Sequence, residues 1–247
     1  MSLESRTPGQ EPIGLSAMHH QHLALGAVMV ESDGWLRPSR YATVEQELEQ
    51  IGRSVGLCDI SATGKLSLQG SELDSALGGV FTDLRPLGVA VARRQRVTGV
   101  DNSESVVLMR LAYDEMMVLT SPSLAPSVVK TLEEQASQCS HVVNLTSALA
   151  GVRITGPSGH LLLAALTEID VAPEVFPNSS CAQARVADTH GTLLRLDLGA
   201  LLSYEFYFGR EFGEYMWEAL LDAGHEYEVA PFGLEAMERL NAGEAGE

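Results

Sequence analysis

The sequence predicts an α+β protein made of two related, largely antiparallel sheet-plus-helix subdomains. Its 247 residues fit two small domains or one large one, because single hydrophobic cores stop growing near ~250 residues. Hydrophobic residues make up 45% of the chain, which is typical of a globular protein. The order strand, helix, hairpin and helix also appears twice along the chain, and an internal repeat of this kind points to a duplicated architecture.

The two ends of the chain are predicted to lie outside the core. Residues 1–14 are expected to be a disordered tail, because Pro8, Gly9, Pro12 and Gly14 stand among polar residues that can bury little surface. Residues 241–247 are expected to be frayed for the same reason.

Residues 15–64 are predicted to be an N-terminal segment that carries a covering helix. Val44, Leu48, Ile51 and Val55 fall at helical spacing, which places them on one face of a helix from about 43 to 54. We expect this apolar stripe to pack on the core.

Residues 65–146 are predicted to form the first subdomain. The alternating run 65–69 is typical of a strand, and Gly70-Ser71 then opens a helix that extends to Val80. The elements expected next are a hairpin, a helix that ends at Gln138, and a last strand, with the three strands at 106–111, 116–120 and 142–145.

Residues 151–243 are predicted to form the second subdomain, in the same order. A strand at 152–155 leads into Gly156-Pro157, and proline suits the first turn of the helix expected at 160–166. The elements expected after that helix are a hairpin of 183–187 with 192–197, a strand at 204–208, a helix at 211–223 and a short strand at 226–229.

The charge of the chain excludes several classes of partner. Thirty-three acidic residues stand against 16 basic ones, for a net charge of −17, and Lys65 and Lys130 are the two lysines. Such a field repels phosphate backbones and anionic lipid surfaces, so we expect neither nucleic acid nor membrane as a partner. The longest apolar stretches, such as 161–166, are too short to span a bilayer.

We predict no metal site and a cytoplasmic location. Cys58, Cys139 and Cys181 have no metal-ligand spacing, and the histidines at 19, 20 and 22 have no cysteine or carboxylate partners at fixed spacing. These histidines are therefore expected to be a loop and cap feature. The N-terminus has no secretory signal pattern, which favours buried free thiols in a reducing compartment.

Several strings nevertheless resemble one family. They are H-L-A-L-G-A-V-M-V at 22–30 with Gly34-Trp35, Pro38 and Tyr41, then Gly56-Leu57-Cys58-Asp59-Ile60-Ser61 with Gly64, then Gly156-Pro157, 217–224 and Gly233-Leu234. In this order and at these intervals they resemble the glycine-cleavage aminomethyltransferase (T-protein) family, which includes folate-dependent demethylases and sarcosine oxidase subunits. The resemblance covers residues 19–243 and implies subdomains around a central folate-binding cavity, in a chain truncated before the family's third domain.

The resemblance also implies which residues act, and it shows that the site is altered. Matching the strand at 106–111 places Glu104 and Ser105 on the family's paired aspartates, so Glu104 and the nearby Asp101 are the candidate catalytic residues. Glu205 and Tyr204 match the end of the family's folate-binding run, whose first glutamate is replaced by Leu201. Near the C-terminus, Met237 replaces an arginine of the family, with Arg239 two residues later as a candidate cofactor-binding residue. A family tyrosine is likewise replaced by Ala92.

The resemblance implies a tetrahydrofolate-dependent one-carbon transferase, or a derivative of one, that acts on a small amine or methylated substrate. The altered positions predict that tetrahydrofolate binds weakly or not at all. Two alternatives stay open: a non-catalytic protein resembling the small subunit of heterotetrameric sarcosine oxidase, with another protein subunit as its partner, or a cavity repurposed for different small-molecule chemistry.

Overall fold

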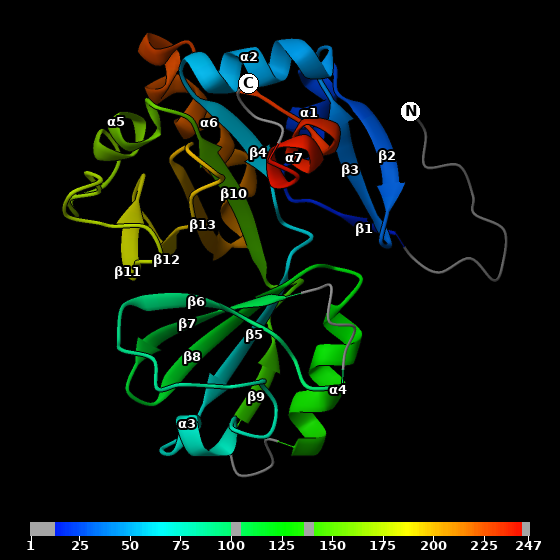
Figure 1. The fold of residues 1–247 in the computed structure, drawn as a ribbon. Coiled ribbons are helices and arrows are strands. Elements are labelled where there is room, and N and C mark those ends of the chain that lie inside the picture. Colours follow the sequence, from blue (N-terminus) through cyan, green and yellow to red (C-terminus); the bar gives the residue numbers. More distant parts are fainter. Residues whose placement is uncertain (1–12, 100–104, 136–140, 244–247) are drawn as a thin grey trace, which may run out of the picture.

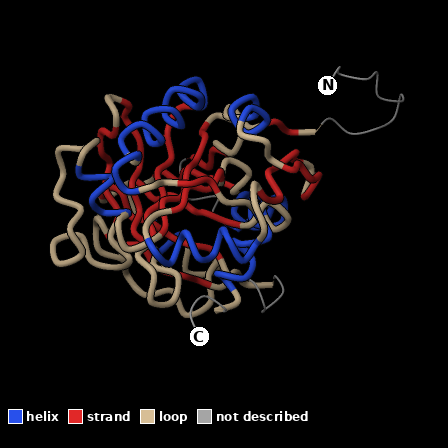
Figure 2. The backbone as a smooth tube through the Cα atoms, turned by 90° about the horizontal axis from the view of Figure 1, so that it is seen from above, coloured by secondary structure: helices blue, strands red, loops and turns tan. Residues whose placement is uncertain are grey.

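The computed structural model describes residues 13–99, 105–135 and 141–243. Within this part of the chain, the strands form two large sheets and one small one, and helices cover the outer faces of the large sheets (Figure 1). From above, the helices lie around the outside of the strands (Figure 2). The α+β fold class predicted from the sequence is confirmed.

The N-terminal segment forms the small sheet and the covering helix. The sheet has the order β1-β3-β2. The elements are β1 (Gly14–Leu15), α1 (His19–Ala24), β2 (Val28–Ser32), β3 (Trp35–Arg40) and α2 (Val44–Arg53). Gly14 was expected in the tail but pairs with Trp35 in the small sheet. The close approach of the indole ring requires glycine there, because a β-carbon would lie 2.7 Å from the ring.

The first large sheet has five antiparallel strands in the order β6-β7-β8-β5-β9. Two helices lie on its outer side (Figure 1). The core cluster on this side consists mostly of buried leucine and valine side chains. The elements are β5 (Gly64–Gln69), α3 (Leu73–Ala76), β6 (Val91–Gln95), β7 (Val106–Ala112), β8 (Glu115–Thr120), α4 (Ala125–Gln135) and β9 (His141–Asn144).

The second large sheet has the order β11-β12-β13-β10-β4-β14, and it is antiparallel except where β14 joins β4. Its elements are β4 (Gly56–Asp59), β10 (Leu149–Thr155), α5 (Gly159–Ala164), β11 (Cys181–Val186), β12 (Thr189–Arg195), β13 (Ser203–Gly209), the 3-10 turn η1 (Arg210–Phe212), α6 (Gly213–Ala223), the 3-10 turn η2 (His225–Tyr227), β14 (Ala230–Pro231) and α7 (Leu234–Asn241).

The two sheets exchange strands. β4 directly precedes β5 of the first large sheet but pairs with β10 in the second. Conversely, β9 directly precedes β10 of the second large sheet but pairs with β5 in the first. Backbone hydrogen bonds also join the edges of the sheets, from the Ala92 amide to the Ser179 carbonyl at 2.7 Å and from the Cys181 amide to the Ala90 carbonyl at 3.0 Å. The two sheets share one strand order, β6-β7-β8-β5-β9 in the first and β11-β12-β13-β10-β4 in the second, so the repeat is visible in the structure. The division into segments 1–14, 15–64, 65–146 and 151–243 stays a prediction.

Helix α2 covers the core as predicted. Ile51 and Val55 are buried, and Val44 and Leu48 pack partly buried against the same apolar side chains. Thr43 caps the helix, because its hydroxyl accepts from the Gln46 amide and the Gln46 side chain accepts from the Thr43 amide.

Two predicted elements were wrong. The helix expected to reach Val80 ends at Ala76, since the Gly78-Gly79 pair that follows favours chain turning over helix. The strand expected at 226–229 is the turn η2 followed by Glu228 in the left-handed region at φ 50°, and the strand pairing begins at Ala230.

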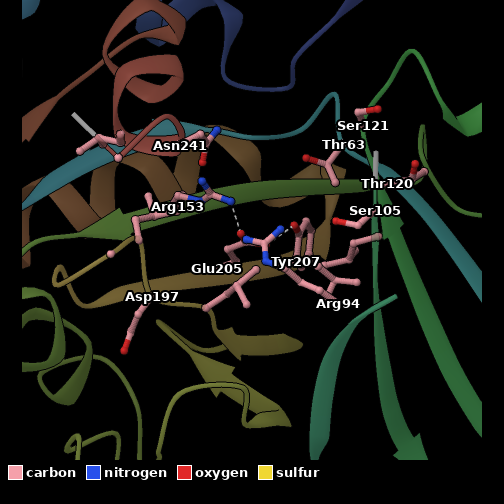
Figure 3. Close-up of a pocket in the computed structure, with 17 residues that line it drawn as sticks. Thr63, Arg94, Ser105, Thr120, Ser121, Arg153, Asp197, Glu205, Tyr207 and Asn241 are labelled. Atoms are coloured by element: carbon pink, nitrogen blue, oxygen red, sulfur yellow. Dashed lines mark hydrogen bonds and ion pairs between the residues drawn. The ribbon is translucent and has the colours of Figure 1, made fainter. Parts of the chain in front are cut away.

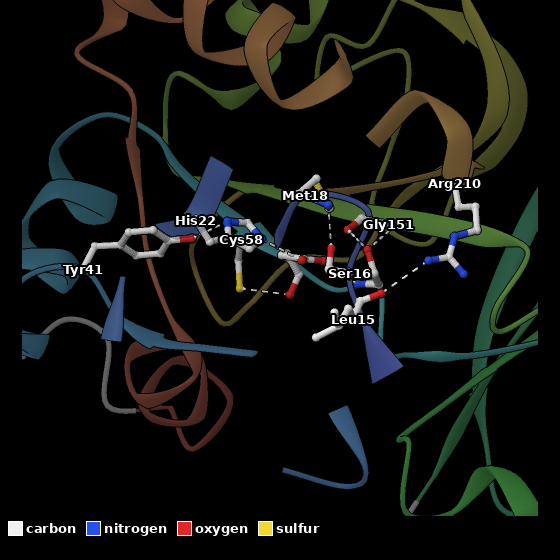
Figure 4. A network of polar contacts seen from close by, with 10 residues as sticks. Leu15, Ser16, Met18, His22, Tyr41, Cys58, Gly151 and Arg210 are labelled. Carbon is white, nitrogen blue, oxygen red and sulfur yellow. Dashed lines mark hydrogen bonds and ion pairs between the residues drawn. The ribbon is translucent and has the colours of Figure 1, made fainter. Parts of the chain in front are cut away.

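The histidines at 19, 20 and 22 were expected in a loop or cap, but they lie in helix α1. His22 is fully buried, with its Nε2 atom 2.8 Å from Asp59 Oδ2 and its Nδ1 atom 2.8 Å from the Tyr41 hydroxyl (Figure 4). Cys58 and Cys181 are buried free thiols, whereas Cys139 lies outside the described residues. In the described part of the chain we find no group of three side chains fit to hold a metal, and no helix long and apolar enough to cross a membrane.

Candidate functional site

A cavity of about 530 Å³ lies between the two large sheets (Figure 3). This volume is within the roughly 300–1,000 Å³ of small-molecule sites. Strands of both sheets, the β12–β13 connection and the end of α7 supply its walls. The apolar lining is Val107, Leu119, Leu196, Leu198 and Leu240, and the polar lining is Thr63, Arg94, Ser105, Thr120, Ser121, Arg153, Asp197, Glu205, Tyr207 and Asn241.

Strand β13 directs Glu205 and Tyr207 into the cavity, because alternate side chains of a strand point to opposite faces. Phe206 and Phe208 point to the other face and pack against the helices. Both faces of this strand are covered, so Glu205 is 3% exposed even though it is charged. Alternate residues of β13 therefore line the cavity, as Glu205 and Tyr207 do, or pack against the helices, as Phe206 and Phe208 do.

Arg153 neutralises the Glu205 carboxylate. The two residues stand opposite each other in the antiparallel register of β10 and β13. Arg153 Nη2 donates to Glu205 Oε1, and the Tyr207 hydroxyl donates to Oε2 at 2.5 Å. Burial lowers the pKa of Arg153, but the attraction and hydrogen bond of Glu205 together with the neighbouring Tyr207 and Cys58 outweigh it, so the pKa lies above its ordinary value.

Tyr207 remains a neutral donor at ordinary pH. Burial raises its pKa, and the neighbouring Glu205 carboxylate raises it further. The hydroxyl therefore donates to Glu205 rather than accepting from it. Because an ionised carboxylate offers about four lone-pair sites, Glu205 keeps acceptor capacity toward the cavity after these two bonds.

Lys65 lies behind this wall of the cavity. It is fully buried, and its Nζ donates to the carbonyls of Ser61 and Thr63 at 2.7 Å each. The same atom lies 5.9 Å from the centre of the Tyr207 ring. Burial lowers the pKa of Lys65 to about 7.

The structure brings some of the sequence-predicted site residues to the cavity. Glu205 lines it, and so does Ser105, the residue that the resemblance matches to a family carboxylate. Glu104 and Asp101, the candidate catalytic residues, lie outside the described residues. Leu201, in place of the family's first folate glutamate, packs partly buried in the apolar core between the sheets.

Tyr204 and Arg239 do not line the cavity. Tyr204 is fully buried on the helix face of β13, where its hydroxyl donates to the Val171 carbonyl at 2.8 Å. Arg239 lies on α7 and its Nη1 donates to Glu45 Oε1 on α2 at 2.9 Å. Each therefore lies on a face of its strand or helix that points away from the cavity.

Sequence reasoning missed Arg153, Tyr207 and Lys65. The signal for Tyr207 was its spacing of two from Glu205, which puts both side chains on one strand face. The signal for Lys65 was its rarity in a chain with two lysines. The pairing of Arg153 with Glu205 depends on strand register across 52 residues, and no local pattern reports it.

The groups that line the cavity match part of what a pterin would need. The pterin amino group and ring N–H need a carboxylate acceptor, which Glu205 provides. Its carbonyl and ring nitrogens need donors, and side chains with donor groups, Arg94, Ser105 and Asn241, line the cavity. The apolar walls suit a flat ring.

Comparison with known proteins agrees with the fold. The family model described as the GCVT N-terminal domain matches residues 18–245. The glycine cleavage system aminomethyltransferase T from Bartonella henselae superposes with a TM-score of 0.80 at 20% identity, over 93% of this chain and 62% of that one. A chain of the heterotetrameric sarcosine oxidase from Corynebacterium sp. U-96 superposes with a TM-score of 0.61 at 20% identity, over 86% of this chain and 95% of that one.

Two relatives are similar in sequence over nearly the whole chain. The sarcosine oxidase subunit alpha of Rhizobium meliloti is 26% identical over 93% of this chain and 25% of its own length. The aminomethyltransferase of Saccharopolyspora erythraea is 27% identical over 96% of this chain and 64% of its own length. The chain thus spans 25% and 64% of the lengths of these two relatives. Because the family model matches residues 18–245, the chain belongs to the GCVT N-terminal domain family.

Proposed function

We propose that this chain is an aminomethyltransferase-like domain that binds tetrahydrofolate in the cavity between its two large sheets. The observation that carries the proposal is the Glu205 carboxylate, which is buried at the wall of a ligand-sized cavity and holds spare acceptor capacity. When bound, tetrahydrofolate supplies the ring nitrogens that accept a one-carbon unit. The protein's part is to hold the pterin on Glu205 and keep the reacting atoms away from water.

Binding is expected to be weak. Leu201 replaces one family carboxylate, and Glu205 already accepts from Arg153 and Tyr207. One lost charge-assisted hydrogen bond costs about 1.5–3 kcal/mol, or about 10- to 150-fold in affinity. We therefore expect a Kd in the high micromolar range or poorer.

One-carbon transfer by the chain alone is expected to be low. Ser105 lines the cavity where the family has an ionised carboxylate beside the reacting amine. A serine hydroxyl neither carries that negative charge nor takes up a proton near pH 7. Glu104 is the adjacent carboxylate in the sequence and is the proposed substitute, with Asp101 near it. The substrate class is a small amine or methylated amine.

The test is a calorimetric titration with 5-formyltetrahydrofolate, a stable reduced folate. The variant Glu205→Gln should weaken binding at least 10-fold, because a neutral amide replaces the carboxylate. Glu238→Gln is the matched control, since this exposed residue of α7 does not line the cavity. Thermal unfolding checks that Glu205→Gln folds, and Tyr207→Phe, which removes one hydroxyl, is the milder second variant. Submicromolar binding, or binding indifferent to Glu205→Gln, contradicts the proposal.

A second candidate function is a non-catalytic subunit of a larger oxidase. It is favoured by one observation: the matched chain of the Corynebacterium heterotetramer is covered over 95% of its length. On this proposal the chain acts through a protein partner. The same titration discriminates, because a purely structural subunit gives no folate binding that depends on Glu205.

A further inference from the structure

Lys65 is a buried amine that the proposed function does not use, and it lies where the chain joins the two large sheets. The chain runs from the second large sheet to the first through residues 60–63, between β4 and β5. It returns through residues 145–148, between β9 and β10. We call these segments the first and the second passage. Because the cavity lies between the sheets, contacts to the two passages bear on the position of its walls.

Lys65 holds both passages. Its Nζ donates to the carbonyls of Ser61 and Thr63 in the first passage, at 2.7 Å each. Its backbone amide donates to Thr146 Oγ1 in the second passage at 3.1 Å, and its carbonyl accepts from the Leu145 amide at 2.7 Å. The side chain of Lys65 therefore orders the turn of the first passage, while its backbone anchors the second passage to β5.

The same amine reaches the wall of the cavity from behind. Thr63 and Tyr207 line the cavity (Figure 3). Lys65 Nζ lies 5.9 Å from the centre of the Tyr207 ring, which is within the range of a cation–π contact. The Tyr207 hydroxyl in turn donates to Glu205 at 2.5 Å. Lys65 is fully buried and does not line the cavity, so it acts on a ligand through the side chains in front of it.

We propose that Lys65 is a positioning residue for ligand binding in this cavity, because its amine holds Thr63 and Tyr207 in place at the wall. The proposal rests on the proposed function, since it concerns the same cavity and the same ligand. An amine buried at this place is costly, because it loses its hydration. An apolar side chain would fill the same space at a lower cost but would leave both carbonyls of the first passage without this donor.

The titratable groups of the described residues that face the Lys65 amine come from β4 and β13. Asp59 of β4 favours the charged amine, but burial outweighs it and lowers the pKa of Lys65 to about 7. Tyr207 of β13 is neutral at ordinary pH, and Glu205 beyond it pairs with Arg153 of β10. The uncharged residues that pair with Lys65 or bond it from β8 and the two passages are Leu119, Ser61, Thr63, Leu145 and Thr146.

This arrangement gives ligand binding a pH dependence of defined sign. A ligand that covers Thr63 and Tyr207 removes water from the wall in front of Lys65, and further loss of water disfavours the charged amine. The pKa of Lys65 is then lower in the complex than in the free protein, so the free protein binds more protons near pH 7. The affinity for the ligand should therefore rise as the pH increases through about 7.

The test measures the binding of 5-formyltetrahydrofolate by calorimetry at about pH 6 and about pH 8. The variant is Lys65→Met, which keeps an unbranched side chain but cannot donate. The matched control is Lys130→Met, which removes the other lysine of the chain, an exposed residue of α4 that does not line this cavity. Thermal unfolding checks that both variants fold. Lysine labelled with 13C at Cε adds an NMR readout that needs no substitution at position 65, because Lys130→Met leaves Lys65 as the source of the remaining signal.

The wild type and Lys130→Met should bind about 3- to 5-fold more tightly near pH 8 than near pH 6. Lys65→Met should bind about 10-fold more weakly near pH 8 and lose this pH dependence. Saturating folate should also shift the Lys65 signal and lower its pKa. If folate binds but Lys65→Met keeps the affinity or the pH dependence of the wild type, or the Lys65 signal does not respond to folate, this inference is wrong and the proposed function stands. If the wild type binds no folate up to millimolar concentration, both are wrong.

Discussion

Removing one partner of the Arg153–Glu205 pair should destabilise the protein strongly. The two side chains are 13% and 4% exposed, so neither charge is well solvated once its partner is gone. Leaving one member of a buried pair unpaired costs about 3–5 kcal/mol. For a chain of this size, 1 kcal/mol shifts the Tm by about 2–4 °C, so Glu205→Gln or Arg153→Met should each lower the Tm by about 6–20 °C.

The double variant Arg153→Met with Glu205→Gln should recover most of this loss. It buries no unpaired charge, and the glutamine still accepts from the Tyr207 hydroxyl. Thermal and urea unfolding of the wild type, both single variants and the double variant give the coupling energy. Glu45→Gln is the control, because the Glu45–Arg239 pair lies at the surface and its loss should leave the Tm unchanged. Additive effects of the two single variants, or losses below about 1 kcal/mol, would refute the reasoning.

Three further predictions concern Lys65, two glycines and Ser105. Folding lowers the pKa of Lys65 from 10.5 to about 7, so between these pH values the unfolded chain binds more protons and the stability of the protein rises with pH. Urea unfolding should show this rise in the wild type and a smaller rise in Lys65→Met. Equal slopes of stability against pH in the two proteins would count against a buried amine. Gly156→Ala should destabilise the protein by more than about 2 kcal/mol, because Gly156 has φ 130° and a β-carbon there would lie 2.3 Å from the Ser54 carbonyl oxygen. In α2, a β-carbon at Gly52 meets no atom within 4 Å, so Gly52→Ala should stabilise the protein by about 0.5–1 kcal/mol. Similar Tm values for the two variants would contradict this prediction. Ser105→Asp should raise the rate of one-carbon transfer from methylated amines to tetrahydrofolate by more than Glu104→Gln lowers it. If the unmodified protein turns over and Glu104→Gln abolishes that turnover, Glu104 is instead the catalytic carboxylate.

Patterns local in sequence predicted the elements well. The stripe of α2 and the hairpins of β7 with β8 and of β11 with β12 were visible because side-chain period reports which face is buried. The exchange of β4 and β9 between the sheets was not visible in the sequence, because strand pairing joins residues far apart in the chain. The duplicated order predicted the fold class, while strand partners had to come from the structure.

The candidate site was predicted in part for the same reason. Glu205 followed from the resemblance, but both faces of β13 are covered, so alternation alone did not show that Tyr204 faces the helices and Tyr207 the cavity. Arg239 follows Met237 by two residues on helix α7, which is a rotation of about 200° around the helix axis. Met237 contacts Arg153, so Arg239 lies on the opposite side of the helix, where it binds Glu45.

A crystal structure of the protein with 5-formyltetrahydrofolate tests the central claim most directly. We expect the pterin between the two large sheets, with its amino group and ring N–H within hydrogen-bond distance of the Glu205 carboxylate. A folate bound elsewhere on the protein, or a cavity empty of folate at saturating concentration, would contradict the account.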